Sequence, residues 1–356
     1  AGSDNQLLYR KEGFSGYLAK PVSGALLEAA VLSILPKGLV NLNEEAQQED
    51  IEKDILIFEQ AQRRSILVTT DSVCDLPESL RKEFSLSVCP YYVCTEEGRF
   101  LDGAELSPDE LLAHIAGGRK GYSHPPEVED YERFFAEKLT EAQNVIHITM
   151  ARHVSDGYQN ACEAAKSFEN VTVLDSGHLS SSMGLVVLCA AYMAEHHAAK
   201  EEILEAVKRM ERFISSAFII NNTHMMCQSG RIPKRIQILC DALLLHPVLA
   251  LKRSRMVVSR MEIGSFSHAA KKYVKRTLQN TGNIDRRILF ITYSGMDEKR
   301  LRFIQSLVQQ YCPFERVYLQ KASSAIASNC GPGSFGLLFM RRDDAAVPFF
   351  QTAAHD

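Results

Sequence analysis

The side chains that could do chemistry in this sequence are hydroxyls and carboxylates placed where predicted strands meet helices. Ser72 follows the first buried strand and Asp75 comes just before a helix, so these groups either cap that helix or line a pocket. Ser155 lies between a predicted strand and a helix that begins near Asp156. Its hydroxyl and the free amides of that first turn either form a plain N-cap or hold an anion, although Asp156 would repel a carboxylate.

Two further polar residues stand at predicted turns. Ser123 precedes His124 and two prolines at another helix entry, and Arg231 follows a glycine, a position where most arginines are solvated surface groups. No general base stands beside a nucleophile in any of these motifs, so the sequence does not predict an enzyme. The eleven histidines have no metal-ligand spacing and no CxxC pair is present, so we expect neither a metal site nor a cofactor.

The segment 331–336, Gly-Pro-Gly-Ser-Phe-Gly, matches the spacing of a dinucleotide fingerprint but not its context. That fingerprint follows a strand and opens a helix, whereas here a strand is predicted at 337–340. A glycine turn packed against a ligand or another backbone fits better. The sequence also lacks GxxxxGK[ST] and GxSxG, so we expect neither ATP binding nor a nucleophile elbow.

The overall composition is that of an ordinary globular chain. Of 356 residues, 46% are hydrophobic and 24% are charged, which excludes disorder, collagen and coiled coil as global structures. The net charge of −4 gives no basic field for nucleic acid or an anionic membrane, and the apolar stretch 185–194 is too short for a membrane span. The odd cysteine count and the lack of a signal peptide predict a reduced, cytoplasmic protein.

Strands and helices alternate from Ser65 onward, which predicts an α/β fold with a parallel sheet covered by helices. We assign residues 65–214 to a first α/β domain, 215–343 to a second, smaller one, and 344–356 to a tail. In the first domain we expect strands at 66–70, at 86–94 with an interruption at its proline, at 145–149 and at 171–174. We expect helices from Pro77, Ser107 and Lys200, and one after each of the last two strands. In the second we expect strands at 217–221, 248–251, 287–293, 316–319 and 337–340, and helices near 266–279 and 297–311.

The first 64 residues follow a different pattern. A short strand ending at Lys20-Pro21 and a helix up to Pro36 cannot close a core by themselves. Residues 1–36 resemble the last strand and helix of a response-regulator receiver domain, the alternative being a surface strand–helix unit. The acceptor aspartate of a receiver would precede residue 1, so we expect no phosphorylation here. Residues 37–64 predict a charged linker that becomes a helix.

Six short motifs, taken in order, resemble those of the DegV family of fatty-acid-binding proteins over about residues 65–343. They are DSxxDLP at 71–77, SxP at 123–125, the segment 148–159, DS…S…G at 175–184, GRI at 230–232 and GPGxxG at 331–336. The resemblance implies a two-domain α/β fold that holds one fatty acid between its domains. Some DegV proteins present the carboxylate of this fatty acid to a separate kinase, so the resemblance also implies a fatty acid kinase as a partner.

By the same resemblance, the polar end of the lipid is expected near Ser123, Ser155 and Arg231. Tyr122 and Asn329 stand where the family has threonine and histidine, and they can offer a hydroxyl and an amide to a carboxylate. The other expected ligand-binding residues are Ser72, Gly331 and Gly333.

The sequence departs from the family pattern near this head group. The family's paired serines are Ala151 and Arg152 here, and His246 replaces a lysine. The resemblance therefore supports an acyl pocket more strongly than the usual carboxylate contacts. The alternative function is a signalling or interaction protein in which the receiver-like segment regulates a degenerate DegV domain. A long apolar tunnel would favour the lipid-carrier function, whereas an empty polar cleft would favour the regulatory function.

Overall fold

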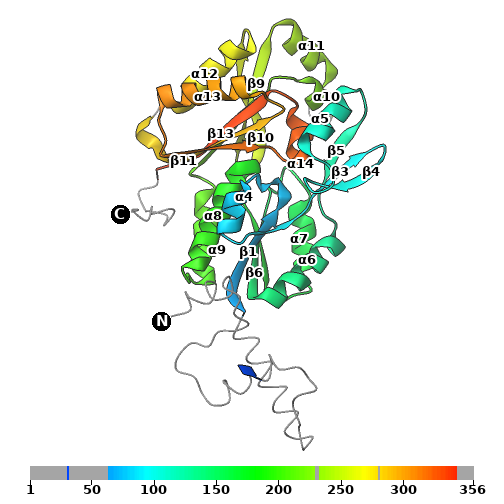
Figure 1. Ribbon diagram of the computed structural model, residues 1–356, viewed down its shortest axis with the longest axis vertical. Coiled ribbons are helices and arrows are strands. Elements are labelled where there is room, and N and C mark those ends of the chain that lie inside the picture. Colours follow the sequence, from blue (N-terminus) through cyan, green and yellow to red (C-terminus); the bar gives the residue numbers. More distant parts are fainter. Residues whose placement is uncertain (1–29, 32–62, 229–231, 280, 343–356) are drawn as a thin grey trace, which may run out of the picture. The chain divides into compact units, whose positions relative to one another are not determined.

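The computed structural model describes residues 30–31, 63–228, 232–279 and 281–342 (Figure 1). The chain divides into two compact units, residues 1–65 with 139–143 and residues 66–138 with 144–356. The receiver-like segment lies outside the described residues except for Ala30 and Val31, which are helical. Arg231, nearly all of the predicted linker 37–64 and the tail 344–356 also lie outside them.

The first sheet has four strands in the order β2-β1-β6-β7. Their bounds are β1 (Arg64–Asp71), β2 (Ser87–Cys89), β6 (Ala142–Thr149) and β7 (Val171–Asp175). β1 runs parallel to β2, and β6 parallel to β7. The last residues of β1 and β6 are buried without alternation, as expected of strands covered on both faces. The predicted α/β class with a helix-covered parallel sheet is therefore confirmed.

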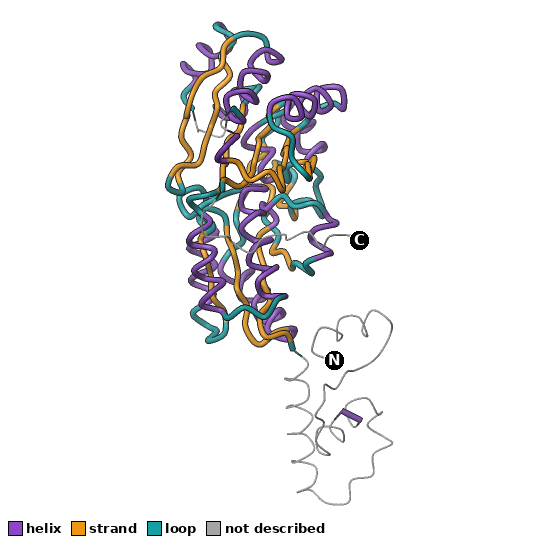
Figure 2. Tube along the Cα trace, turned by 90° about the vertical axis from the view of Figure 1, so that its left-hand side faces the viewer, coloured by secondary structure: helices purple, strands orange, loops and turns teal. Residues whose placement is uncertain are grey.

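Helices cover both faces of this sheet. They are α4 (Glu78–Glu83), α6 (Val128–Glu141), α7 (Gly157–Ala165), α8 (Ser180–Glu195) and α9 (Lys200–Met210), with a short 3-10 helix η2 (Ser72–Cys74) after β1. Helix α5 (Pro108–Ala116) contacts the later strand β5 (Gly121–His124) and helix α14 (Ser324–Cys330) instead. In Figure 1, α8 and α9 lie on one side of β1 and β6, and α6 and α7 on the other. Figure 2 shows the same strands between two sets of helices. Within the described ranges, no helix has the length and apolar content needed to cross a bilayer.

The predicted strand 86–94 is divided at Pro90. Proline has no N–H to donate to a ladder, so β2 ends at Cys89 and the chain enters a different sheet. This small antiparallel sheet has the order β4-β3-β5 and consists of β3 (Tyr92–Thr95), β4 (Gly98–Leu101) and β5 (Gly121–His124). It was not predicted, and its strand β5 carries Tyr122 and Ser123.

The larger second sheet has six strands in the order β10-β9-β8-β13-β11-β12. They are β8 (Ile214–Ile219), β9 (Leu245–Lys252), β10 (Arg255–Ile263), β11 (Ile284–Ser294), β12 (Arg316–Lys321) and β13 (Ser334–Arg341). β11 and β12 run parallel, and the other neighbours run antiparallel. Strand β10 was missed by the sequence analysis. The division into domains at 214/215 stays a prediction, although this sheet begins at that point.

The helices that follow β8 in the chain include three short ones that the sequence analysis missed. These three are α10 (His224–Gln228), α11 (Lys234–Ala242) and α14 (Ser324–Cys330). The other two, α12 (Phe266–Leu278) and α13 (Glu298–Tyr311), were predicted, and a 3-10 helix η3 (Thr281–Asn283) precedes β11. Helix α8 contacts β8, β11 and β13 as well as η2. It is buried on nearly all sides because it packs between the two larger sheets.

Candidate functional site

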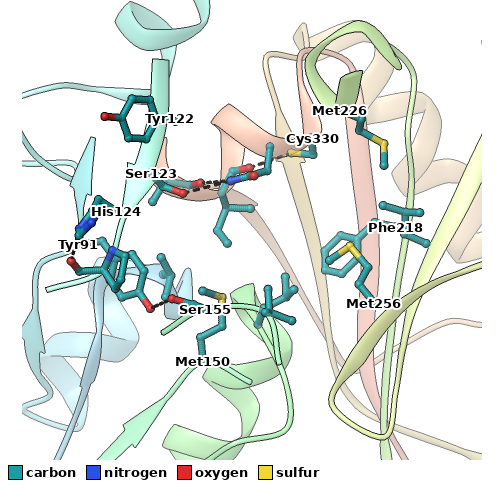
Figure 3. A pocket seen from close by; sticks show the side chains of 18 of the residues that line it. Tyr91, Tyr122, Ser123, His124, Met150, Ser155, Phe218, Met226, Met256 and Cys330 are labelled. Carbon is teal, nitrogen blue, oxygen red and sulfur yellow. Dashed lines mark hydrogen bonds between the residues drawn. The ribbon is translucent and has the colours of Figure 1, made fainter. Parts of the chain in front are cut away.

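A pocket of about 590 Å³ lies between residues from the first half of the described chain and residues of the second sheet (Figure 3). We call it the apolar pocket. Its apolar lining consists of Val73, Met150, Val154, Leu179, Phe218, Ile220, Met226, Leu249, Met256, Ala325 and Ile326. Small-molecule sites in proteins usually have about 300–1,000 Å³ and a mostly apolar lining with few polar groups, so this pocket has the size and character of a binding site.

Polar side chains gather on one side of the apolar pocket. Figure 3 shows Ser123, His124 and Ser155 on that side, whereas Phe218 and Met256 lie across from them. This separation is the arrangement that an amphipathic ligand requires, because its polar end needs hydrogen-bond partners and its chain needs apolar contacts.

Ser123 and Asn329 form one polar contact in the pocket. Asn329 Nδ2 donates a hydrogen bond to Ser123 Oγ at 3.3 Å and another to the Ala325 carbonyl at 2.9 Å. The two residues are far apart in the sequence, on β5 and on α14, so the contact exists only in the folded chain. Tyr122 also lines the pocket, and because it is 56% exposed it lies at the rim.

Ser155 contacts both the start of α7 and a buried phenol. Its Oγ accepts a hydrogen bond from the Gly157 amide at 3.2 Å and lies 2.9 Å from the Tyr91 hydroxyl. Burial raises the pKa of Tyr91 well above its usual value, so this phenol keeps its proton and can donate it to Ser155. Both acceptor positions of Ser155 Oγ are then occupied, and its own O–H is available to a ligand. The N-cap of α7 is Asp156, so the predicted N-cap role of Ser155 is wrong, although Ser155 Oγ still accepts the amide of Gly157 at the start of the helix.

Gly157 is required for this arrangement. A Cβ on Gly157 would lie 2.5 Å from the Tyr91 hydroxyl oxygen and 3.2 Å from that of Tyr131. Both tyrosines are buried, and their hydroxyls bond to Ser155 and to Asp71, so relieving this contact would disturb those bonds. Only glycine lets the first turn of α7 approach these two rings.

Ser72 and Asp75 do not line the apolar pocket, and Asp75 does not cap the helix that follows it. The N-cap of α4 is Pro77, with no side-chain cap. Asp75 Oδ1 instead accepts a hydrogen bond from the Ser323 amide at 2.8 Å, at the start of α14. Ser72 donates to Asp102 Oδ2 at 2.6 Å. These two residues therefore contact protein groups around the pocket, the Ser323 amide and Asp102, and not the pocket itself.

Two buried carboxylates thus hold the N-terminus of α14, the helix that carries Asn329. Asp102 Oδ1 accepts the Ala325 amide at 3.2 Å, beside the contact of Asp75 with Ser323. Helix N-termini favour negative groups, since their first amides lack partners. Desolvation nevertheless raises the pKa of both carboxyls, that of Asp75 to about 7.

Gly331 and Gly333 end α14 and do not line the apolar pocket. Both have left-handed φ values, 70° and 79°, and their amides donate to the carbonyls of Ala327 and Ser294. A Cβ would lie 2.9 Å from Met225 Sδ at Gly331, and an equivalent atom at Gly333 would clash with Asn221. The atoms nearest to such a Cβ at both glycines are side-chain atoms and not those of another backbone, and a ligand role for these glycines stays a prediction.

The predicted polar residues Tyr122, Ser123, Ser155 and Asn329 all line the apolar pocket. Within the described part of the chain, the pocket lining contains no lysine or arginine, and Asp156 adds a carboxyl group. The sequence analysis missed Tyr91 and the apolar lining. Those apolar residues follow the same patterns as core residues, so no sequence signal separates them. The described ranges also contain no cluster of three or more potential metal ligands.

Comparisons with known proteins agree with this fold. A family model for uncharacterised proteins of the DegV family matches residues 65–342. A DegV domain-containing protein of Caldanaerobacter subterraneus subsp. tengcongensis is 24% identical over 277 residues, which are 77% of this chain and 98% of that protein.

Solved structures give the same result. A fatty-acid-binding DegV family protein from Thermus thermophilus has a TM-score of 0.71 and 27% identity, over 78% of this chain and all of that one. DegV from Bacillus subtilis, a fatty acid binding protein, has a TM-score of 0.68 and 18% identity over the same shares. A family member from Eubacterium eligens, loaded with heptadecanoic acid, has a TM-score of 0.67 and 17% identity, again over 78% and 100%. Since the family model covers most of the chain and the fold agrees with it, the chain belongs to the DegV family.

Proposed function

We propose that this chain is a cytoplasmic carrier, without catalytic activity of its own, that holds a fatty acid or a similar single-chain lipid in the apolar pocket. The observation that supports this most directly is the division of the pocket into a polar side and an apolar side (Figure 3). The Thermus thermophilus relative, which has the same fold and is described as fatty-acid-binding, supports the same ligand class.

In this proposal, burial of the acyl chain supplies most of the affinity. Each buried methylene contributes roughly 0.8 kcal/mol, so a chain of about sixteen carbons contributes near 12 kcal/mol before the cost of association. A hydrogen bond to a charged head group adds only about 1.5–3 kcal/mol. The polar residues therefore orient the ligand more than they hold it.

Ser155 is the proposed donor to the head group, because its O–H remains available after its contacts with Gly157 and Tyr91. Ser123 and Asn329 are proposed to complete the polar end. The exposed rim beside Tyr122 gives a second protein access to that end. On this ground we include a separate fatty acid kinase among the proposed partners. The role of Arg231, which lies outside the described residues, rests on the family resemblance alone.

Native mass spectrometry of the purified chain, followed by lipid extraction, tests the ligand class directly. A delipidated sample should then bind a fluorescent fatty acid, and Ser155→Ala should weaken that binding by about five- to thirtyfold. Ser306→Ala is the matched control, since Ser306 is an exposed serine on α13. Failure of the unmodified protein to bind any tested chain length would contradict the carrier and favour the regulatory alternative.

A further inference from the structure

A second cavity, of about 920 Å³, lies among β8, β9, β10 and α12. We call it the basic pocket, because six of its lining residues are cationic. These are Arg212, Lys252, Arg253, Arg260, Arg276 and Arg341. Glu211 is the acidic residue of the lining, and Ser215, Ser259 and Thr277 add hydroxyl groups. Such a concentration of positive charge is notable in a chain whose net charge is −4.

Only part of this charge is neutralised by the protein. The buried carboxylate of Glu262 accepts two hydrogen bonds of 3.1 Å from Arg276 and lies 3.3 Å from Arg260 Nε. Glu211 accepts a hydrogen bond from Ser254 at 3.1 Å. The other four cationic residues make no ion pair within the described part of the chain; they are Arg212, Lys252, Arg253 and Arg341. The cavity therefore keeps a surplus of positive charge that an anion can balance.

The sheet itself opens to form this cavity. The pairing of β8 with β9 covers Ala217–Ile219 and does not continue through residues 214–216, which line the cavity. On the neighbouring strand, the register with β9 shifts between Val258 and Arg260, which leaves Ser259 as an extra residue. A β-bulge of this kind redirects the following side chain, here Arg260.

The hairpin that joins β9 to β10 places a further cation at the cavity. Its two turn residues, Arg253 and Ser254, have φ values of 51° and 59°. Such a turn strongly prefers asparagine, aspartate or glycine, so an arginine here is energetically unfavourable. Ser254 is buried and bonded to Glu211, which holds the turn in place.

The basic pocket lies on the opposite face of β8 and β9 from the apolar pocket. Ala217 pairs directly with Ala250, and both line the basic pocket. The next pair, Phe218 with Leu249, lines the apolar pocket. Because successive side chains of a strand point to opposite faces, this strand pair separates the two cavities.

From these observations we infer that the basic pocket is a binding site for a ligand that carries phosphate groups. Arginine guanidinium groups and a lysine match the geometry and charge of phosphate oxygens, and the hydroxyls of Ser215 and Thr277 supply neutral donors, whereas the Ser259 hydroxyl already donates to the Val248 carbonyl. A phosphate on a free small molecule and a phosphate in a lipid head group present the same chemistry to these side chains. The site is separate from the proposed lipid site and does not depend on it.

Calorimetric titration of the full chain at low salt, with inorganic pyrophosphate as the probe, tests this site. We expect saturable binding with one pyrophosphate per chain. Arg253→Gln and Lys252→Gln should each weaken it by about tenfold or more, because each removes a charge-assisted contact. The matched control is Lys275→Gln, which removes an exposed lysine of α12 beside Arg276 but outside the lining. Fatty-acid binding by the delipidated protein should be the same in all four proteins.

Vesicles of phosphatidylglycerol, compared with vesicles of neutral phosphatidylcholine, distinguish the two phosphate sources. The site would be assigned to a lipid head group if the protein binds the anionic vesicles but not pyrophosphate, and if Arg253→Gln weakens this vesicle binding while Lys275→Gln does not. Pyrophosphate binding with the same dependence would assign it to a free ligand. Equal weakening by the control variant, or no binding of either probe, would overturn the inference.

Discussion

Replacing Asp75 by asparagine should remove a large part of the pH dependence of folding stability. Asp75 is buried, and its two carboxyl oxygens accept hydrogen bonds from Ser180 Oγ at 2.6 Å and from the Ser323 amide at 2.8 Å. Desolvation outweighs these bonds and raises the pKa of Asp75 from 3.8 to about 7. The native protein therefore holds this proton to a higher pH than the unfolded chain does.

The sign of the effect follows from proton linkage. Between pH 4 and pH 7 the native state binds more protons at Asp75 than the unfolded state, so the free energy of unfolding falls as the pH rises through this window. A change in pKa of this size corresponds to a loss of about 4 kcal/mol, most of it complete by pH 7. Asp75→Asn has no charge to desolvate. Its amide can donate to Ser180 while its carbonyl accepts from Ser323, and asparagine tolerates the left-handed φ of 40° at this position.

Equilibrium urea unfolding at several pH values from 4.5 to 8.5 measures this effect. The stability of Asp75→Asn relative to the unmodified protein should increase with pH and level off above pH 7. Asp102, whose pKa is also raised by burial, is present in both proteins, so its own desolvation contributes to both curves, whereas the repulsion by which it raises the pKa of Asp75 belongs to the measured difference. Glu205→Gln, an exposed substitution on α9, should run parallel to the unmodified protein. If the Asp75→Asn curve also runs parallel to it, burial of an ionisable Asp75 is not the cause of the pH dependence.

Three further perturbations test other contacts. Gly157→Ala would place a Cβ 2.5 Å from the Tyr91 hydroxyl, so it should lower the free energy of unfolding by about 1–3 kcal/mol and weaken fatty-acid binding. The same change at exposed Gly282, where a Cβ has open space, is the control and should change neither. Tyr131→Phe removes a 2.8 Å hydrogen bond to buried Asp71 and should cost about 1–3 kcal/mol in urea unfolding; an unchanged midpoint would argue against that bond. Burial raises the pKa of the Cys74 and Cys189 thiols to about 12, so both should react with Ellman's reagent at pH 8 only after denaturation. Detection of a modified Cys74 or Cys189 by mass spectrometry of the native protein would contradict this.

Elements with a strong local pattern were predictable from the sequence. The first turn of α5 forms the capping box expected from Ser107 and Glu110, and the buried strands β1, β6 and β7 lie where apolar runs predicted them. Strand β10 was missed because its residues are mostly exposed or half-buried, so they lack the apolar run that marks a buried strand. The small sheet β4-β3-β5 was missed because the apolar run of 86–94 continues past Pro90, while the hydrogen-bond ladder does not.

The polar residues of the candidate site could be predicted from sequence motifs, whereas the residues that hold them in place through contacts in the folded chain could not. Ser123, Ser155 and Asn329 were identified through motifs, but the groups that place them were not. Asp75 was expected to cap the helix beside it in sequence, and instead it meets the Ser323 amide, 248 residues away. A carboxylate favours any helix N-terminus that lacks partners, and local sequence cannot say which helix the fold brings to it. Because Asp75 contacts α14, and α14 carries Asn329, a residue that does not itself line the pocket helps to determine where one of the pocket's polar groups lies.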